Sequence, residues 1–220
     1  MNEEIEGFKK MMHYEITAIE EQKKDFNRCS VFINGVFGFG ITKKAVERYQ
    51  LRVGQVFNTT DYEKLMITLQ LDKAKLKALD MISRGNKSEK QVRERLLKTE
   101  YSSYIVEEVL AFLKKYHYID DKALAKRYIE SKSQYSHKSL RQIQTELYKK
   151  GIYLEDMKVY CEEAEKQEEE NVNYFLDKFK YNPEWDLKQK QKIINRLLTR
   201  GFQYSQIEKC LRKRNEQFDA

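Results

Sequence analysis

The stretch Ser139–Ile152, SLRQIQTELYKKGI, decides the fold, because the chain contains its pattern three times. Ser88–Tyr101, SEKQVRERLLKTEY, lies 51 residues before it, and Gln189–Phe202, QKQKIINRLLTRGF, lies 50 residues after it. Four apolar positions superpose in the three copies: Val92, Ile143 and Ile193; Leu96, Leu147 and Leu197; Leu97, Tyr148 and Leu198; Tyr101, Ile152 and Phe202. Residues spaced i, i+4 and i+5 fall on one side of a helix, so we expect each copy to be a helix that buries these positions.

The two ends of the repeated segment carry helix-boundary signals. The first two copies open as Ser88-x-x-Gln91 and Ser139-x-x-Gln142, the pattern of a capping box, in which the serine oxygen accepts from an amide of the first turn. Gly151 and Gly201 close the last two copies, where a left-handed residue commonly ends a helix. A repeat of this length, without glycine-rich or proline-rich filler, is typical of a helical array.

Composition limits the class of protein. The chain has 220 residues, of which 40% are hydrophobic and 35% charged, with a single proline, and this favours long helices with solvated faces. Its three cysteines are widely spaced and form no CxxC pair, so a disulfide framework is not expected and a reducing cytoplasm fits. The acidic N-terminus does not resemble a signal peptide, and no apolar run approaches the roughly 18 residues of a membrane span.

The N-terminal part predicts a small β module. Two apolar runs, Phe26–Ile33 and Val36–Ile41, flank Asn34-Gly35, which is the strongest short signal for a hairpin with a type I′ turn. In that register Phe32 faces Phe37 and Ile33 faces Val36. Further strands are expected at Ile16–Glu20 and at Leu51–Phe57, the second of which is broken by Gly54, with a short helix capped by Thr42 between them. The alternative is that Phe32, Phe37 and Phe39 form an aromatic platform for nucleic acid.

The remaining chain is expected to be helical and organised by the repeat. Thr60-x-x-Glu63 is a further capping box, and a helix should run from there to about Ser83. Each repeat then contains three helices, with the repeated segment in the middle. The fold class is therefore mainly α: three tandem three-helix repeats in an elongated array, preceded by a small module that contains a β-hairpin. The expected domains are residues 1–60, 61–119, 120–167 and 168–220.

The sequence offers no catalytic or cofactor-binding constellation. Its three histidines share no metal-ligand spacing with cysteines or acids, and no phosphate-binding loop is present. Asp120-Asp121 is the only adjacent acid pair considered for catalysis, and its position between helices favours an N-cap instead. We therefore expect no enzyme activity, no cofactor and no metal.

Three segments together resemble the RecX family, the bacterial regulators of the recombinase RecA. They are Ser88–Leu96; Tyr118-Ile119-Asp120-Asp121 with Ala125 and Tyr128-Ile129; and Lys138–Ile152. Family members usually carry phenylalanine where Leu124 stands, which is a conservative difference. The resemblance covers about Lys73 to the C-terminus, and Ile16–Phe57 looks like the N-terminal extension of longer members.

The resemblance implies a non-enzymatic regulator in DNA repair, homologous recombination and the SOS response. Such a protein would bind RecA and RecA–DNA filaments and inhibit the recombinase, ATPase and co-protease activities of RecA. The resemblance also implies tandem three-helix repeats. Weak direct DNA binding is compatible with this role, and we expect a monomer.

The charge distribution suggests where a partner binds. The formal net charge is +7, and residues 122–150 hold eight Lys/Arg against two Asp/Glu, while residues 188–200 hold five against none. In repeat two, Arg141, Thr145 and Lys149 fall opposite the core line, and Lys87, Lys138 and Lys188 superpose at the starts of the repeated segments. The candidate partner-binding residues are Lys87, Lys90, Arg93, Lys98, Lys138, Arg141, Lys149, Lys150, Lys188, Arg196 and Arg200.

Three other interpretations remain open. A basic face of this kind can serve solubility alone. Trihelical units with a basic second helix also resemble helix-turn-helix modules, which predicts a general DNA-binding protein. The third possibility is a helical-repeat scaffold for a protein unrelated to DNA.

Overall fold

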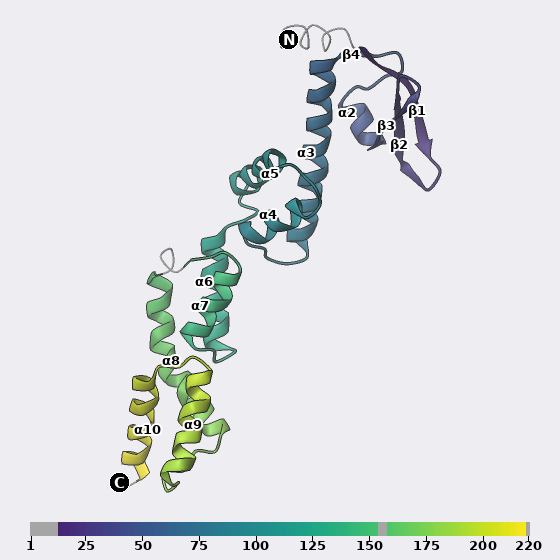
Figure 1. Cartoon of the computed structure of the whole chain (residues 1–220). Coiled ribbons are helices and arrows are strands. Elements are labelled where there is room, and N and C mark those ends of the chain that lie inside the picture. Colours follow the sequence, from purple (N-terminus) through teal and green to yellow (C-terminus); the bar gives the residue numbers. More distant parts are fainter. Residues whose placement is uncertain (1–12, 154–157, 219–220) are drawn as a thin grey trace, which may run out of the picture. The chain divides into compact units, whose positions relative to one another are not determined.

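The structure is a computed structural model, and it describes residues 13–153 and 158–218 (Figure 1). The chain divides into two compact units, Met1–Lys73 and Ala74–Ala220, and the division falls inside helix α3 (Thr59–Ser83). The first unit contains the β-sheet, and the second is helical throughout its described part. None of the helices in the described ranges combines the length and apolarity needed to cross a membrane.

The sheet of the first unit has four strands, and every pairing in it is antiparallel. In chain order they are β1 (His13–Gln22), β2 (Asp25–Ile33), β3 (Val36–Thr42) and β4 (Val56–Asn58), and in space the order is β3-β2-β1-β4. Asn34 and Gly35 form the β2–β3 turn at φ angles of 51° and 82°. Phe32 pairs with Phe37 and Ile33 with Val36, so the hairpin and its predicted register are confirmed.

The core of the first unit lies on one face of this sheet. Ile16, Val31 and Ile41 are buried there, and Ala45 of helix α2 (Lys43–Arg48) and Leu69 of α3 belong to the same cluster. Thr42 caps α2 by accepting from the amide of Ala45, as predicted.

The structure argues against the aromatic platform considered for this sheet. Phe39 is only 5% exposed, because it belongs to the buried cluster, whereas Phe37 is 60% exposed. Phe32 makes an edge contact with Phe37, with ring centroids 6.2 Å apart. The three rings therefore do not share one open surface on which bases could stack.

The predicted strand Leu51–Phe57 is wrong over most of its length, since β4 pairs only at its end. Leu51 is buried in the sheet cluster, and Gly54 makes a turn with a φ of 82°. The amide of Gly54 donates to the carbonyl of Ile16 at 2.8 Å, which ties this turn to β1. A glycine at positive φ ends the extended run that the apolar residues suggested.

Helix α3 begins earlier than the sequence predicted. Asn58, rather than Thr60, supplies the cap: its side-chain oxygen accepts from the amide of Asp61 at 2.9 Å, and its side-chain nitrogen donates to the Asp61 carboxylate. An asparagine is at least as good an N-cap as a threonine, so the helix begins after Asn58. The C-terminal half of α3 belongs to the second unit, where Ala74 and Ala78 are buried.

The second unit contains the repeated segments as helices α4, α7 and α9, which we call the motif helices. The helices after α3 are α4 (Glu89–Leu97), α5 (Ser103–Lys115), α6 (Asp121–Gln134), α7 (Leu140–Lys149), α8 (Lys158–Lys178), α9 (Leu187–Thr199) and α10 (Tyr204–Phe218). Repeat one consists of the end of α3 with α4 and α5, and repeat two begins at α6. Helix α8 is continuous across the expected boundary at residue 167, so repeats two and three share it.

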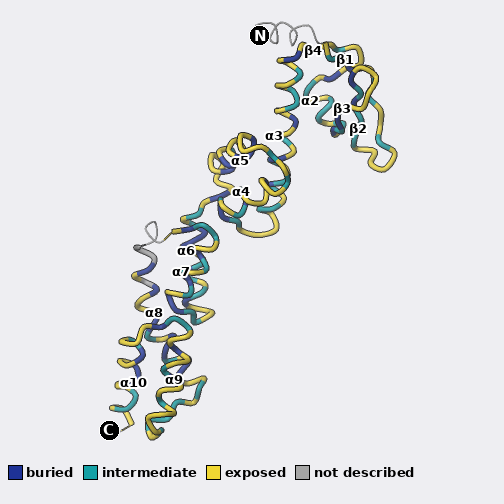
Figure 2. The backbone as a smooth tube through the Cα atoms, in the orientation of Figure 1, coloured by how far each residue is buried: buried dark blue, intermediate teal, exposed yellow. Residues whose placement is uncertain are grey.

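The cores of the repeats use the predicted anchors with two exceptions, of which the smaller is Tyr101, half-buried where its equivalents Ile152 and Phe202 are buried. Val92, Ile143 and Leu197 are at most 5% exposed in the described structure, and Ile143 and Leu197 lie in separate clusters of repeats two and three. By contrast, Leu97, Tyr148 and Leu198 are 44%, 63% and 39% exposed, so the prediction that they are buried is wrong. Each follows a buried leucine, and a rotation of about 100° per residue carries it beyond the narrow buried stripe. Buried and exposed positions alternate along the helices of the second unit (Figure 2).

Candidate partner-binding face of the motif helices

Each motif helix begins at a side-chain cap. Ser88 accepts from the amide of Gln91, whose side chain bonds back to the amide of Ser88, and Ser139 accepts from the amide of Gln142. Helix α9 is capped by a box that the sequence reasoning missed, between Asp186 and Gln189. The signal in the sequence is Asp186-x-x-Gln189, which begins three residues before the position that aligns with Ser88 and Ser139.

The start of one motif helix is bonded to the end of the next. The hydroxyl of Ser88 donates to the carbonyl of Lys150, which ends α7, at 2.6 Å. In the same way, the hydroxyl of Ser139 donates to the carbonyl of Arg200, which ends α9, at 2.6 Å. Each serine hydroxyl thus both accepts and donates a hydrogen bond. The start of α4 meets the end of α7, and the start of α7 meets the end of α9. We call this arrangement the motif-helix row.

A carboxylate completes each of the two joints in this row. Asp121 of α6 accepts from the amide of Glu89 at 3.0 Å, and Glu168 of α8 accepts from the amide of Leu140 at 2.7 Å. Both carboxylates thus stabilise a free amide at a helix N-terminus. Burial nevertheless raises the pKa of Asp121 and that of Glu168, because desolvation of the charged form outweighs these bonds. The acid pair 120–121 therefore serves structure, since Asp120 caps α6 as predicted.

The outward side of the row has the same four positions in each repeat. They are Lys90, Glu94, Leu97 and Lys98 in repeat one, Arg141, Thr145, Tyr148 and Lys149 in repeat two, and Gln191, Asn195, Leu198 and Thr199 in repeat three. All of these residues are exposed. The face is therefore basic in repeats one and two and uncharged in repeat three, with one apolar side chain in each.

Four of the predicted site residues lie on this face. Arg141 and Lys149 stand two turns apart on α7, as the sequence predicted, and both are exposed. Lys90 and Lys98 occupy the equivalent places on α4, and the ammonium of Lys90 lies 4.0 Å from the carboxylate of Glu94. An exposed pair at that distance contributes little to stability, so Lys90 can exchange it for another anion.

Two other predicted residues are engaged in ion pairs within the fold. Arg93 bonds to Glu107 of α5 and, at 2.9 Å, to Glu89, which attaches α4 to α5. Lys138 pairs with Glu146, which also accepts from the hydroxyl of Tyr128 at 2.6 Å. Burial of Glu146 opposes ionisation, but the bonds from Lys138 and Tyr128 prevail and lower the pKa of Glu146.

Three further predicted cations lie over aromatic rings. The ammonium of Lys150 stands 5.5 Å from the ring centroid of Tyr128. The guanidinium of Arg196 stands 4.0 Å from the ring of Phe179, and that of Arg200 stands 4.4 Å from the ring of Phe175. These contacts hold the cations against the body of the repeat, which restricts their reach toward a partner.

The prediction that Lys87, Lys138 and Lys188 occupy equivalent positions at the starts of the motif helices is wrong for Lys188. Lys87 and Lys138 precede the serine caps, whereas Lys188 is the second residue of α9. Helix α9 begins three residues earlier relative to its buried anchors, because Asp186 rather than residue 189 supplies the cap. Lys87 lines a depression of about 400 Å³ together with Arg95 and Lys98.

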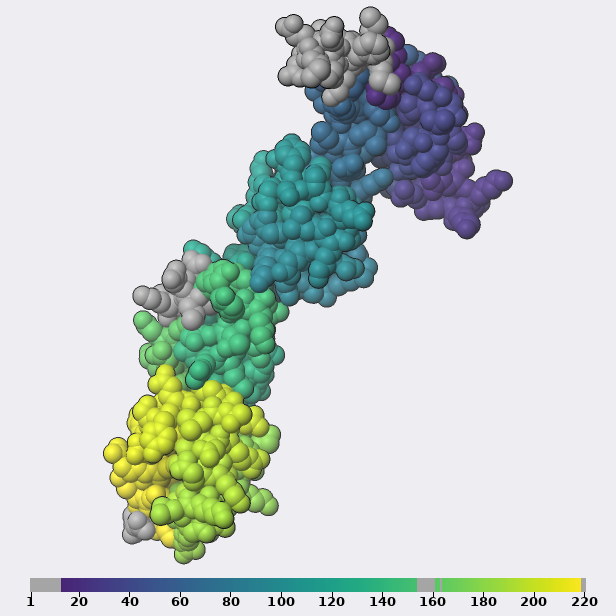
Figure 3. Space-filling model, in the orientation of Figure 1, coloured from purple at the N-terminus to yellow at the C-terminus, as the bar shows by residue number. Residues whose placement is uncertain are grey.

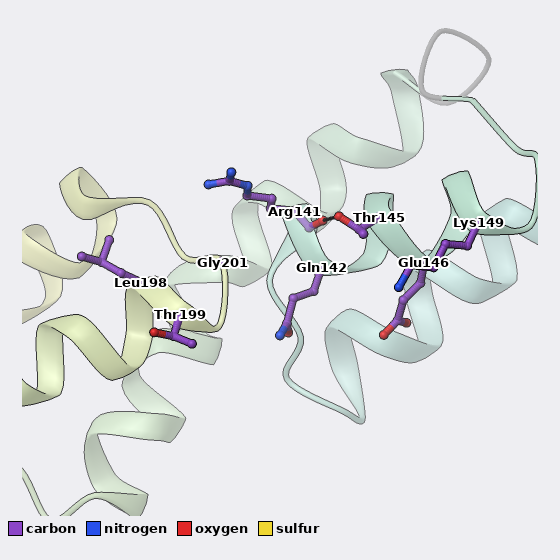
Figure 4. Close-up of a pocket in the computed structure, with 8 residues that line it drawn as sticks. All are labelled: Arg141, Gln142, Thr145, Glu146, Lys149, Leu198, Thr199 and Gly201. Carbon is purple, nitrogen blue, oxygen red and sulfur yellow. Dashed lines mark hydrogen bonds between the residues drawn. The ribbon is translucent and has the colours of Figure 1, made fainter.

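A second depression lies at the joint between α7 and α9, with a volume of about 410 Å³. Figure 4 shows Arg141, Gln142 and Thr145 entering from α7, while Leu198 and Thr199 enter from α9. The surface of α7, green in Figure 3, continues here into that of repeat three, and the bond from Ser139 to Arg200 closes the joint. The lining offers the cations of Arg141 and Lys149 to an anionic group, and it also contains the carboxylate of Glu146, which is paired with Lys138.

The described residues contain no group of three or more His, Cys, Asp or Glu side chains that could hold a metal ion. Cys29, Cys161 and Cys210 are free thiols and all are buried. Burial raises the pKa of the Cys161 thiol and that of Cys210, which makes both poor nucleophiles at neutral pH.

The fold defines a tandem three-helix repeat protein with an N-terminal β-sheet module, in which one outward face recurs in every repeat. Residues 14–58 match the Regulatory protein RecX N-terminal domain, and residues 74–113 match the RecX first three-helix domain. The chain therefore belongs to the RecX regulatory-protein family, as the resemblance had indicated.

Similar proteins extend this likeness over most of the chain. Regulatory protein RecX of Clostridioides difficile (strain 630) is 31% identical over 201 residues, which cover 90% of this chain and 94% of that protein. Its counterpart in Clostridium acetobutylicum is 32% identical and covers 90% of this chain and 95% of that protein. A crystal structure of regulatory protein RecX shares the fold with a TM-score of 0.67 at 23% identity, covering 89% of this chain and 97% of that one. RecX from Lactobacillus salivarius has a TM-score of 0.59 at 22% identity over 66% of this chain and 97% of that one.

Proposed function

We propose that this protein is a regulator of the recombinase RecA that binds the RecA–DNA filament and restrains its recombinase, ATPase and co-protease activities. Its membership of the RecX family supports the partner. The observation that carries the proposal is the motif-helix row, in which one outward face recurs in three repeats and is basic in two of them. A repeated face suits a partner that is itself a repeating polymer.

In this proposal the protein acts by binding and carries out no reaction. Arg141 and Lys149 offer two exposed cations on α7, and Lys98 offers a third on α4. Once one repeat has bound a filament, contacts of the others are intramolecular, so the combined affinity exceeds that of a single repeat. A filament held along the row is hindered in the subunit movements that accompany ATP hydrolysis and strand exchange.

The first test measures inhibition of the RecA ATPase on single-stranded DNA and its dependence on the basic face. Reversal of charge in Arg141→Glu with Lys149→Glu should weaken inhibition by about tenfold or more, because two attractive contacts become repulsive. The control is Lys122→Glu with Arg127→Glu, which makes the same change in net charge on exposed residues of α6 in the same repeat. Circular dichroism verifies that both variants keep the helical content of the parent.

The results separate the candidate roles. If both double variants inhibit RecA as well as the parent, the basic face serves only solubility. If the parent itself leaves RecA activity unchanged at saturating protein, the proposed function is wrong. ATP hydrolysis or nuclease activity that copurifies with the protein would contradict the assignment as a non-enzymatic regulator.

Direct DNA binding is a second candidate, favoured by the depression that Lys87, Arg95 and Lys98 line. Binding through such phosphate contacts should weaken steeply between low and physiological salt, because each contact releases about one counterion. Fluorescence anisotropy with a labelled single strand and a labelled duplex measures it. Tight binding to one duplex sequence that changes little with salt would instead favour the helix-turn-helix interpretation.

A further inference from the structure

The equivalent residues Leu97, Tyr148 and Leu198 are apolar and exposed, although the repeat places each directly after a fully buried leucine. Each is followed by a polar residue on the outward face, Lys98, Lys149 and Thr199 respectively. The ring of Tyr148 also makes an edge contact with the exposed ring of Tyr153, with centroids 5.4 Å apart. One large apolar side chain within a rim of polar groups is the usual composition of a protein-binding hot spot. We call these three residues the apolar ladder.

The joints of the row fix the ladder in place. The bonds from Ser88 to Lys150 and from Ser139 to Arg200 attach successive motif helices, so the ladder residues recur once per helix along one row. Leu198 also forms part of the lining of the depression at the second joint, beside Arg141 of the preceding motif helix (Figure 4). The apolar side chain of Leu198 and the cation of Arg141, which comes from the neighbouring repeat, therefore line the same depression.

The chemistry of the ladder favours a protein rather than nucleic acid. Leu97 and Leu198 have no aromatic ring on which a base could stack. On its own helix Leu198 is surrounded by Gln191, Asn195 and Thr199, which carry no charge, and Arg141, a cation in the same depression, comes from the preceding motif helix. Side-chain amides and hydroxyls around leucine instead suit the mixed apolar and polar surface of a folded protein.

We propose that the apolar ladder is the contact through which the motif-helix row binds successive subunits of one protein filament, with each ladder residue entering an apolar site on a subunit. The inference rests on the proposed function, since the filament is that of RecA. Lys98 and Lys149 beside the first two ladder residues favour acidic groups near those sites, and near the third ladder residue the cations of the shared depression are those that α7 contributes. The basic residues then orient the partner, and the apolar side chains supply most of the affinity.

The experiment compares two triple variants. Leu97→Ala, Tyr148→Ala and Leu198→Ala together remove the ladder, and all three side chains are exposed, so the repeat cores stay intact. The control replaces Tyr104, Tyr135 and Tyr204 by alanine; these residues are 60%, 82% and 53% exposed, one in each repeat, and none lies on a motif helix. Each variant is titrated into the RecA ATPase assay on single-stranded DNA and into a binding assay with the same DNA alone.

The ladder variant should raise the concentration for half-inhibition at least about tenfold, since truncation of hot-spot residues commonly has effects of this size, while the control changes it less than about twofold. Binding to bare DNA should be unchanged in both variants. A ladder variant that inhibits as well as the parent overturns the proposal and leaves the proposed function standing. Equal loss of bare-DNA binding would identify the row as a nucleic-acid surface instead. A parent that does not inhibit RecA overturns the proposed function and this inference together.

Discussion

The two joints of the motif-helix row use the same bonds but join their repeats differently. At each joint a serine hydroxyl donates to a carbonyl of the next motif helix, and a carboxylate accepts from the first amide. Repeats two and three additionally share helix α8, which carries Ala164 in the core of repeat two and Val172 in that of repeat three. Helices α5 and α6, by contrast, are separated by residues 116–120.

This difference indicates that the alignment of the motif helices and the cooperative unfolding of the repeats have separate structural causes. The polar bonds at a joint align two motif helices, and they are equivalent at both joints. A shared helix couples two hydrophobic cores, so that neither opens without disturbing the other. Repeats two and three should therefore unfold as one unit, while repeat one opens independently of them.

A break in α8 is expected to have the largest effect. Lys166→Pro removes a backbone hydrogen bond within α8 and should destabilise the helix by about 3 kcal/mol or more. Hydrogen exchange should then show lost protection in both α7 and α9, with α4 and α5 little changed. Lys166→Ala is the control, since this residue is exposed. Loss of protection in only one of the two repeats would show that α8 does not couple them.

Substitution of Gly201 should cause the second-largest loss of stability. Its φ is 86°, and a Cβ there would lie 2.7 Å from the hydroxyl oxygen of Ser139, which bonds across the second joint. Gly201→Ala therefore combines backbone strain of about 1–2 kcal/mol with a weakened joint. Gly54→Ala has a similar φ of 82° and nothing within 4 Å, so it reports the strain alone. Equal shifts of the denaturant midpoint in the two variants would contradict a role for the joint.

The serine caps should show a smaller and asymmetric effect. Ser139→Ala and Ser88→Ala each remove a cap and leave a carbonyl without its partner, which amounts to about 1–2 kcal/mol. Because of the shared helix, Ser139→Ala should increase hydrogen exchange in both repeats two and three, whereas Ser88→Ala should affect α4 alone. Ser102→Ala, which removes a cap with no bond across a joint, is the control. If Ser88→Ala also increased hydrogen exchange in a second repeat, the two joints would not differ in how they couple their repeats.

The smallest effect concerns pH. Burial raises the pKa of Glu168 in the folded protein, so its contribution to stability is present below the unfolded pKa and is lost as pH rises through the folded value. Glu168→Gln removes this dependence, and its Tm relative to the parent should be more favourable at pH 7 than at pH 4. Asp121→Asn should show the same sign but a smaller difference, because Asp121 is less buried than Glu168, which is 3% exposed. An unchanged Tm difference across this pH range would contradict the assignment.

Periodicity and turn chemistry predicted much of this fold from the sequence. The Asn34-Gly35 turn, its register and the serine caps are local signals, because a few adjacent residues determine the backbone there. At Leu51–Phe57 the break at Gly54 was predicted, but the residues before it form no strand: Leu51 is buried against the sheet by tertiary packing without pairing in it.

The candidate face was only partly predictable. Arg141 and Lys149 could be placed opposite the core by helical spacing alone. The pattern could not show that Arg93 is held by Glu107 or that Leu97 is exposed, because both depend on how α5 packs beside α4. The bonds across the joints were also beyond prediction, since they connect residues 61 or 62 positions apart.

The cap of α9 differs from the caps of α4 and α7 in the bonds that it can form. Ser88 and Ser139 are bifunctional, because a hydroxyl accepts from its own helix and still has a proton to give to the next one. Asp186 occupies the same role in α9, but an ionised carboxylate has no proton to donate. A further helix docked there would bring its terminal carbonyl against a second acceptor. In the terms of polymer chemistry, each serine cap is a bifunctional link, whereas the carboxylate of Asp186 is a monofunctional end group.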